Sequence, residues 1–313
     1  MKTLLTNDPA VAADFIKLGG IAAFPTETVY GLGANVFDER AIAKIFEAKR
    51  RPGDNPLIAH IGSLDQIGEL VLEVPDTARR FIEECFPGPL TLVLKKSDRV
   101  PLIATAGLDT IGVRMPGNNI ANEFLKSCGV PIVAPSANIS GTPSPTTWEA
   151  VFDDLNGRID CILRGEETVI GLESTVVDCT SGDPIVLRSG AVSIESLREI
   201  IPSTRSRASG ENEISRSPGM KHKHYAPNAK VLIAGPGFEI PDTGSNAFIG
   251  LELPAGKPTM VKICDSVEDY AHSVFAFFRE CDKKNLATIY CQPVAELGIG
   301  AALMDRLRRA ESR

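Results

Sequence analysis

Over the first 200 residues, short apolar runs alternate with segments whose hydrophobic positions recur at helical spacing. A helix beginning at Pro9 is predicted ahead of a buried strand at Ile21–Phe24. Asp38 stands where it would cap a helix over Glu39–Lys49. We predict further strands at 57–61, 90–95, 111–114, 132–134, 159–163, 175–179 and 185–188, and helices near 63–70, 76–85, 118–127, 145–154 and 194–200.

Several of these strands follow one another closely. Parallel neighbours need a crossover of a dozen or more residues, and some of the intervals are shorter than that. The pattern therefore predicts an α/β domain with α+β character, an open twisted mixed sheet, over residues 1–202.

The pattern stops at residues 203–230, where Ser, Arg, Gly and Pro dominate. Six basic residues against two acidic ones give this segment a charge of +4. One interpretation is a solvated interdomain linker. The other is a linker that folds back over an anionic ligand, which the cluster SPGMKHKHYAP at 217–227, with His222 and His224, favours.

A β/α pattern resumes at residues 231–313. Strands are predicted at 231–234, 247–251, 259–264 and 286–291, and helices at 266–280 and 300–309. This order predicts a small Rossmann-like α/β domain at the C-terminus.

Composition narrows the class of protein. The chain has 313 residues with 43% hydrophobic and 6% aromatic content, which is enough for two aliphatic cores. A net charge of −7 argues against a generally basic nucleic-acid-binding surface, although a local basic patch stays open. No apolar run approaches the ~20 residues that span a bilayer, so we expect a soluble, cytoplasmic protein without membrane contact.

Missing motifs narrow the chemistry. The seven cysteines include no Cys-x-x-Cys pair, and we expect them to be free and buried. The chain has no His-Glu-x-x-His motif, no paired acidic metal motif, no Walker loop and no Gly-x-Ser-x-Gly elbow. We therefore expect no metal bound by the protein itself, and a nucleotide would be held by loops at strand ends.

Cationic side chains gather at predicted element ends. Lys49 and Arg51 end a helix before a rigid Pro-Gly-Asp-Asn-Pro turn, and Arg114 and Arg188 each close an apolar strand. They could converge on one anion, or they could serve the helix dipole and solvent in the ordinary way. His60, within an apolar strand, could be a ligand contact or a satisfied core histidine.

Polar loops adjoin two of the predicted strands. Pro-Ser-Ala-Asn-Ile-Ser-Gly at 135–141 follows a strand, at the position where open α/β sheets bind ligands. Gly-Leu-Glu-Ser-Thr at 171–175 adds hydroxyl groups before another strand. Ser and Asn also favour plain turns, so a structural role for the first loop stays open.

Taken together, the motifs resemble those of the threonylcarbamoyl-AMP synthases, the YrdC-type family, in its two-domain form. The resemblance covers essentially the whole chain and rests on PTETVYGLG, Lys-x-Arg-Pro…Asn-Pro-Leu…His, Pro-Ser-Ala-Asn-x-Ser-Gly, Gly-x-Glu-Ser-Thr-Val-Val-Asp and SPGMKHKHYAP. It implies that L-threonine, bicarbonate and ATP, with Mg²⁺ on the ATP phosphates, give threonylcarbamoyl-AMP and pyrophosphate for tRNA modification. It also implies delivery to tRNA threonylcarbamoyltransferase proteins, and it allows a weak contact with tRNA.

The resemblance also implies roles for individual residues. The basic and polar tetrad of the family matches Lys49, Arg51, Ser136 and Asn138. The ATP contacts match Arg51, Asn55, Thr110, Ser136, Ser144, Arg188 and Tyr225. The L-threonine contacts match Thr28, His60, Arg114, Ala134 and Ser174. Arg114 would hold the amino-acid carboxylate, and Tyr225 would close the site against water.

Two positions depart from the family pattern. Ser189 follows Arg188 where a proline is usual, and Arg50 stands where a small residue is common. Two other functions also fit parts of the sequence. One is an RNA-binding module, and the other is a carbamoyltransferase of the hydrogenase-maturation type, whose zinc-finger cysteines this chain lacks.

Overall fold

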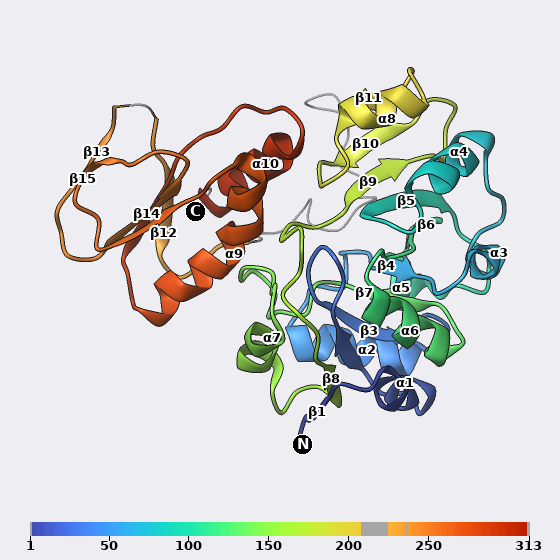
Figure 1. Ribbon diagram of the computed structural model, residues 1–313. Coiled ribbons are helices and arrows are strands. Elements are labelled where there is room, and N and C mark those ends of the chain that lie inside the picture. Colours follow the sequence, from blue (N-terminus) through green and yellow to red (C-terminus); the bar gives the residue numbers. More distant parts are fainter. Residues whose placement is uncertain (1, 208–224, 236, 312–313) are drawn as a thin grey trace.

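The computed structural model describes residues 2–207, 225–235 and 237–311 (Figure 1). The predictions for residues 208–224, which include His222 and His224, lie outside the described residues. The N-terminal strands are β1 (Leu4–Thr6), β2 (Ala22–Phe24), β3 (Gly31–Asn35), β4 (Ile58–His60), β5 (Leu90–Lys95), β6 (Thr110–Arg114), β7 (Ile132–Ala134), β8 (Cys161–Leu163), β9 (Thr175–Asp178), β10 (Ile185–Arg188) and β11 (Arg205–Ser206). The helices between them are α1 (Pro9–Lys17), α2 (Glu39–Lys49), a 3-10 turn (Leu64–Gln66), α3 (Ile67–Leu70), α4 (Asp76–Cys85), α5 (Leu102–Thr105), α6 (Asn119–Cys128), α7 (Trp148–Leu155) and α8 (Ile194–Ile200).

These strands form one mixed sheet in the order β1-β8-β2-β3-β7-β4-β6-β5-β9-β10-β11. The sheet contains parallel pairs, such as β4 with β6, and antiparallel pairs, such as β4 with β7. The predicted mixed α/β fold is confirmed. The predicted helix over 39–49 is also correct, with the Asp38 side chain accepting from the backbone of Arg40 and Ala41.

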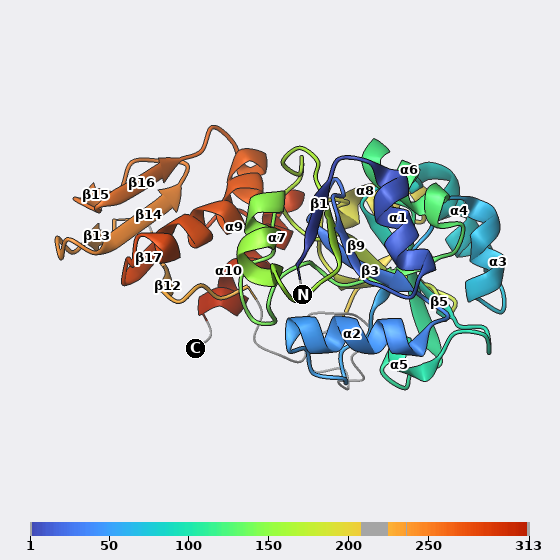
Figure 2. The ribbon, with the colours of Figure 1, turned by 90° about the horizontal axis from the view of Figure 1, so that it is seen from below.

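Two layers of helices cover the sheet. Figure 2 shows α1 and α6 on one side and α2 and α5 on the other. Successive side chains of a strand point to opposite faces of the sheet, so each strand contributes side chains to both helix layers. In β7, Val133 packs in the core under α2, while Ile132 and Ala134 face α1 and α6.

The sequence pattern predicted no strand at the Tyr-Gly-Leu-Gly motif, but its last three residues begin β3. The strand pairs antiparallel with β2 and with β7. Its glycines make room for neighbouring side chains, since a Cβ on Gly33 would lie 2.7 Å from Ile132 Cγ2. Strand β1 and helix α5 were not predicted, because both are too short to show a clear period.

The C-terminal part is a separate sheet with two helices. Its strands β12 (Lys230–Ile233), β14 (Asn246–Gly250), β16 (Met260–Ile263) and β17 (Thr288–Cys291) are parallel in the order β12-β17-β14-β16. The short strands β13 (Glu239–Ile240) and β15 (Ala255–Gly256) pair with each other. Helices α9 (Val267–Lys283) and α10 (Ile299–Glu311) complete it, as the Rossmann-like prediction requires.

The seven cysteines are free, and all but the half-buried Cys85 are buried, as predicted. Within the described part of the chain, no helix has the length and apolarity needed to cross a membrane.

Candidate active site

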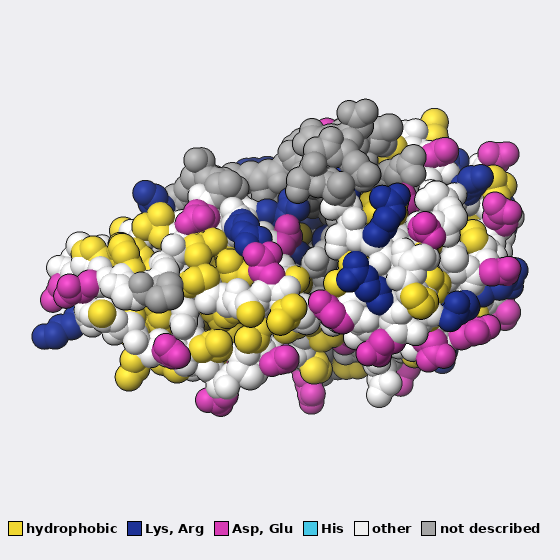
Figure 3. Space-filling model, turned by 90° about the horizontal axis from the view of Figure 1, so that it is seen from above, with side chains coloured by type: hydrophobic (Ala, Val, Ile, Leu, Met, Phe, Trp, Pro, Cys, Tyr) yellow, Lys and Arg dark blue, Asp and Glu magenta, His cyan; other side chains and the backbone are white. Residues whose placement is uncertain are grey.

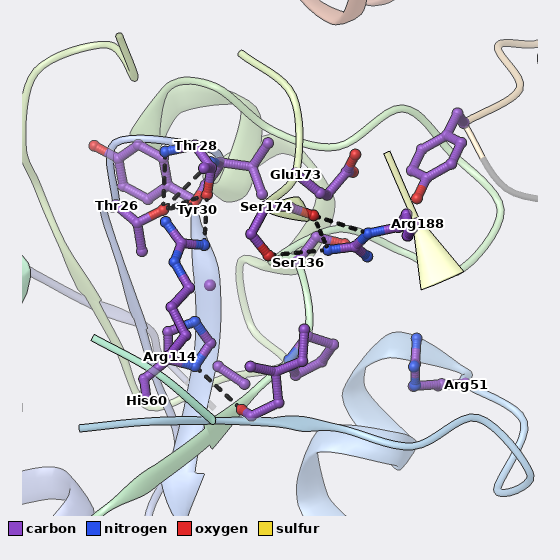
Figure 4. A pocket seen from close by; sticks show the side chains of 16 residues that line it. Thr26, Thr28, Tyr30, Arg51, His60, Arg114, Ser136, Glu173, Ser174 and Arg188 are labelled. Atoms are coloured by element: carbon purple, nitrogen blue, oxygen red, sulfur yellow. Dashed lines mark hydrogen bonds between the residues drawn. The ribbon is translucent and has the colours of Figure 1, made fainter. Parts of the chain in front are cut away.

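One pocket lies where strands β3, β4, β6 and β7 meet the loops that follow β7 and precede β9 (Figure 4). It is lined by Thr26, Thr28, Val29, Tyr30, Gly31, Arg51, Ile58, His60, Arg114, Ala134, Pro135, Ser136, Glu173, Ser174, Arg188 and Tyr225. Figure 4 shows Thr28, His60 and Arg114 toward one end, with Arg188 and Arg51 away from them at the other.

Strand register aligns the side chains of the first end. His60 of β4 and Arg114 of β6 are direct partners in a parallel pair. Ala134 ends β7, which runs antiparallel to β4 and places Ala134 opposite Ile58. The pocket therefore extends across short strands rather than along one common carboxyl edge, because the sheet is mixed.

Arg114 is almost fully buried and held on three sides. Its Nε donates to the Gly88 carbonyl oxygen at 3.3 Å, and its Nη1 donates to Thr28 Oγ1 at 2.9 Å. Its Nη2 lies 2.7 Å from Glu27 Oε1. A guanidinium has five N–H groups, so Nη1 keeps one for a ligand, and Nη2, whose ion pair with Glu27 lacks hydrogen-bond geometry, keeps at least one. A carboxylate matches that pair of donors.

His60 lies beside Arg114 and packs edge-on against Phe24, with ring centres 5.8 Å apart. Burial, assisted by the Arg114 charge, lowers the pKa of His60 to about 3, although nearby backbone carbonyl groups favour the charged form. The imidazole is therefore neutral near neutral pH and cannot serve there as an acid.

This pKa predicts a loss of stability in mild acid. The unfolded chain takes up a proton near the ordinary pKa of 6.5, and the folded chain does so only near 3. Stability is full above 6.5 and is lost as the pH falls between these values. Relative to His60→Leu, the wild type should lose about 2 kcal/mol between pH 7.5 and 5 in urea unfolding. Parallel pH dependences of the two proteins would contradict the assignment.

Arg188 and Ser174 form the wall on the other side of the pocket. Arg188 Nε and Nη2 donate to the Ser174 carbonyl oxygen at 3.1 and 2.9 Å. Nη2 also lies 3.1 Å from Ser174 Oγ, which is 2.8 Å from Thr91 Oγ1. Burial lowers the pKa of Arg188, as expected for a cation inside a crowded positive site.

Lys49 does not line the pocket, although it was predicted to be a site residue. Its ammonium donates to the carbonyl oxygens of Ser136 and Asn138 at 2.5 and 2.6 Å. Ser136 Oγ in turn donates to Asn138 Oδ1 at 2.6 Å. Burial, followed by the Arg51 charge, holds the pKa of Lys49 well below its usual value. The lysine acts here as the support of the 135–141 loop.

Arg51 is held beside the turn that follows α2. Its Nη2 donates to the carbonyl oxygens of Asn55 and Pro56 at 3.2 and 3.1 Å. Burial lowers its pKa to about 10, so the side chain stays charged at neutral pH. Arg50 caps the end of α2 with a φ of 52°, a left-handed conformation that costs a residue with a side chain about 1 kcal/mol. This cost explains why a small residue suits the position.

Two predicted residues, Thr110 and Ser144, are buried but do not line the pocket. Thr110 opens β6, opposite Lys95. Ser144 donates to Glu173 Oε1 at 2.5 Å. Asn55 and Asn138 also lie behind the lining.

Three charged groups were missed as site residues. Glu27 stands inside the first motif and Glu173 inside a motif we noted only for its hydroxyls. Arg306 comes from α10 and lies 2.9 Å from Glu173 Oε2. The available signal was a basic residue on the apolar face of that helix, next to Leu303 and Leu307. Burial alone would raise the pKa of Glu173, but Arg306 and Arg188 outweigh it and lower that pKa.

Tyr225 closes the pocket from the segment after the gap in the described residues. It is buried, and its ring stacks on Phe275 of α9 with centres 5.4 Å apart. The next residue, Ala226, donates its backbone N–H to the Gly141 carbonyl oxygen at 3.0 Å. Both domains therefore fix this tyrosine.

No cluster of three or more His, Cys, Asp or Glu side chains suited to a metal ion occurs within the described ranges.

Two family models divide the chain between them. The model for Sua5, YciO and YrdC proteins, described as "Telomere recombination", matches residues 14–190. The model described as "Threonylcarbamoyl-AMP synthase, C-terminal domain" matches residues 192–312.

Known relatives match over nearly the full length. The threonylcarbamoyl-AMP synthase of Pyrococcus abyssi is 42% identical over 96% of this chain and 93% of that protein. The enzyme of Bacillus subtilis is 39% identical over 98% of this chain and 94% of that protein. The crystal structure of P. abyssi Sua5 complexed with L-threonine superposes with a TM-score of 0.90 at 41% identity, covering 99% of this chain and 97% of that one. The shorter YciO of E. coli, with a TM-score of 0.55 and 25% identity, covers 63% of this chain and 98% of its own.

Both domains, in order and nearly complete, thus match proteins of one kind, and the chain belongs to the threonylcarbamoyl-AMP synthase family in its two-domain Sua5 form.

Proposed function

We propose that this protein joins L-threonine, bicarbonate and ATP to give threonylcarbamoyl-AMP, pyrophosphate and water. The observation that carries the proposal is a pocket with three buried or half-buried arginines, Arg51, Arg114 and Arg188, in a chain that matches this family end to end. Such a pocket suits two anionic reactants that repel each other.

L-threonine would bind at the Arg114 end. The two remaining guanidinium N–H groups would hold its carboxylate. Thr28 and His60 line the same end, and Ser174, on the wall that it forms with Arg188, would contact the amino acid from the opposite side. Ala134 leaves room over the sheet for the substrate backbone.

ATP would bind at the other end. Arg51 and Arg188 would face its phosphates, with Ser136 at the loop between them and Tyr225 above. Asn55, Thr110 and Ser144, predicted as ATP contacts, do not line the pocket, and of the three Ser144 would support this end through its hydrogen bond to Glu173. Mg²⁺ would enter with the ATP phosphates as part of the substrate.

The chemistry needs alignment and positive charge more than acid–base groups. The threonine amine attacks the bicarbonate carbon, a C–N bond forms and a C–O bond breaks, and the departing hydroxide leaves as water with a proton from the amine. A carbamate oxygen then attacks the α-phosphorus, and pyrophosphate departs with the electron pair of the broken P–O bond. The neutral His60 and a pocket lining without a cysteine fit such a reaction.

Tyr225→Ala tests the closing role of this side chain. Removing the ring would open the nucleotide end to water, so we expect the KM for ATP to rise about tenfold and the bound product to hydrolyse faster. Unchanged ATP affinity and an unchanged product lifetime would show that the tyrosine does not close the site.

No specific observation favours either alternative function, the RNA-binding module or the carbamoyltransferase of the hydrogenase-maturation type. Figure 3 shows basic and acidic side chains interspersed on one face rather than gathered into a basic track for RNA. The likeness to full-length HypF, at 22% identity and 28% of that chain, shows the fold alone.

The product is a labile mixed anhydride, so we also propose that it passes directly to a tRNA threonylcarbamoyltransferase, with at most weak tRNA contact.

The direct test is product formation. Incubation with MgATP, bicarbonate and L-threonine should give threonylcarbamoyl-AMP by mass spectrometry, and L-valine, which lacks the hydroxyl, should give far less adduct. Equal adducts from both amino acids would reject threonine as the preferred substrate.

A further inference from the structure

Helix α10 of the C-terminal domain places one arginine inside the boundary between the domains. The Arg306 side chain is 1% exposed. Its Nε donates to Glu173 Oε2 at 2.9 Å, and its Nη2 donates to the Ser189 carbonyl oxygen at 3.0 Å. Its Nη1 donates to Asp305 Oδ2 at 2.7 Å. Two of these three acceptors belong to the N-terminal domain.

The groups that Arg306 contacts continue into the nucleotide end of the pocket. The other oxygen of Glu173 accepts from Ser144 at 2.5 Å. Ser189 directly follows Arg188, which lines the pocket. The Arg306 guanidinium also lies 5.3 Å from the centre of the Tyr225 ring. One side chain thus touches three elements of the wall that would face ATP.

A role in holding the two domains together does not by itself explain the buried contacts of Arg306. The cost of burying an ion pair often cancels its attraction, and an apolar pair would join two domains as well. Other contacts already do so. Arg279 of α9 holds Asp154 of α7 with two hydrogen bonds of 3.0 and 2.8 Å. Gly171 approaches α9 so closely that a Cβ there would lie 2.5 Å from the Cα of His272.

We propose that Arg306 is a positioning residue for ATP, which fixes the nucleotide end of the pocket through Glu173, Ser189 and Tyr225. The C-terminal domain thereby contributes to the active site without touching the substrate. The inference rests on the proposed function for the identity of the nucleotide. Since Arg114, Thr28 and His60 come from N-terminal strands and loops, the L-threonine end should not depend on Arg306.

The test compares two arginines on the same helix. Arg306→Met keeps the length of the side chain and removes its charge and donors. Arg308→Met makes the same change at an exposed residue that pairs only with Glu296 among the contacts of the described chain. The KM values for ATP and for L-threonine come from pyrophosphate release. Calorimetric titration with MgATP alone gives the ATP dissociation constant without requiring turnover.

We expect Arg306→Met to raise the KM and the dissociation constant for ATP about tenfold or more, with the KM for L-threonine changed less than about threefold. Arg308→Met should match the wild type. Unchanged ATP binding in a folded Arg306→Met protein, or an equal rise in both KM values, would overturn the proposal. If Arg306→Met does not fold, Arg306→Lys tests the same proposal. Lysine keeps the positive charge but cannot hold Ser189 and Asp305 while it pairs with Glu173.

A double variant tests the route of the effect. Glu173→Gln keeps an oxygen for Ser144 and removes the charge that Arg306 holds. If Arg306 acts through Glu173, the double variant Glu173→Gln/Arg306→Met should bind ATP no more weakly than Arg306→Met. Additive losses would reject that route. If the wild type binds MgATP but forms no threonylcarbamoyl-AMP, the proposed function fails while the titrations still decide the role of Arg306.

Discussion

Arg114→Lys is expected to raise the KM for L-threonine about 100-fold while the KM for ATP changes less than about threefold. Two charge-assisted hydrogen bonds to the substrate carboxylate would be replaced by one less well aligned contact, at a cost of about 3 kcal/mol. Lysine also cannot reach Gly88, Thr28 and Glu27 together, all of which hold the arginine in place. Steady-state pyrophosphate release at varied L-threonine and varied ATP measures both constants.

The matched control is Arg99→Lys, since Arg99 is exposed and pairs with Glu69 at 3.3 Å on the surface. It should leave both constants within error. A selective rise in the KM for ATP in Arg114→Lys would mean that the two ends of the pocket are assigned the wrong way round.

Lys49→Met is expected to reduce kcat about 100-fold and to lower the free energy of unfolding by about 3 kcal/mol. The variant keeps the packing of the side chain but removes the donor that Ser136 and Asn138 share, leaving buried carbonyl oxygens without a partner. The loop that carries Ser136 would lose its fixed place at the pocket. Pyrophosphate release and urea unfolding measure the two effects.

Lys44→Met supplies the comparison on the same helix. Lys44 is exposed, and its ammonium donates to the Gly19 carbonyl oxygen at 2.7 Å. The stability of this variant should stay within about 0.5 kcal/mol of the wild type, with kcat unchanged. A Lys49→Met protein with full activity would show that the loop needs no such support.

The fold was predictable where local signals were strong. Helix 39–49 has a cap, a periodic apolar face and a stop, and the structure shows it at those bounds. Strand β3 was not predicted, because Gly31 and Gly33 look like loop residues. Their role is to make room for Phe24 and Ile132, which a local pattern does not show.

The site was predictable in its residues more than in its geometry. Motifs pointed to Arg114, Arg188 and Ser136, and the pocket contains all three. The motifs also predicted Lys49 as a site residue, yet its ammonium group binds the 135–141 loop and does not line the pocket. Arg306 could not be placed, because its contact with Glu173 spans 133 residues and depends on how the two domains pack.

Synthesis of threonylcarbamoyl-AMP requires L-threonine and bicarbonate together, and pyrophosphate release measures this requirement. The purified protein is given MgATP with both substrates, and then with each one omitted in turn. We predict release only when both are present. Release that continues at the same rate without L-threonine would contradict the account and point to another acceptor at the Arg114 end of the pocket.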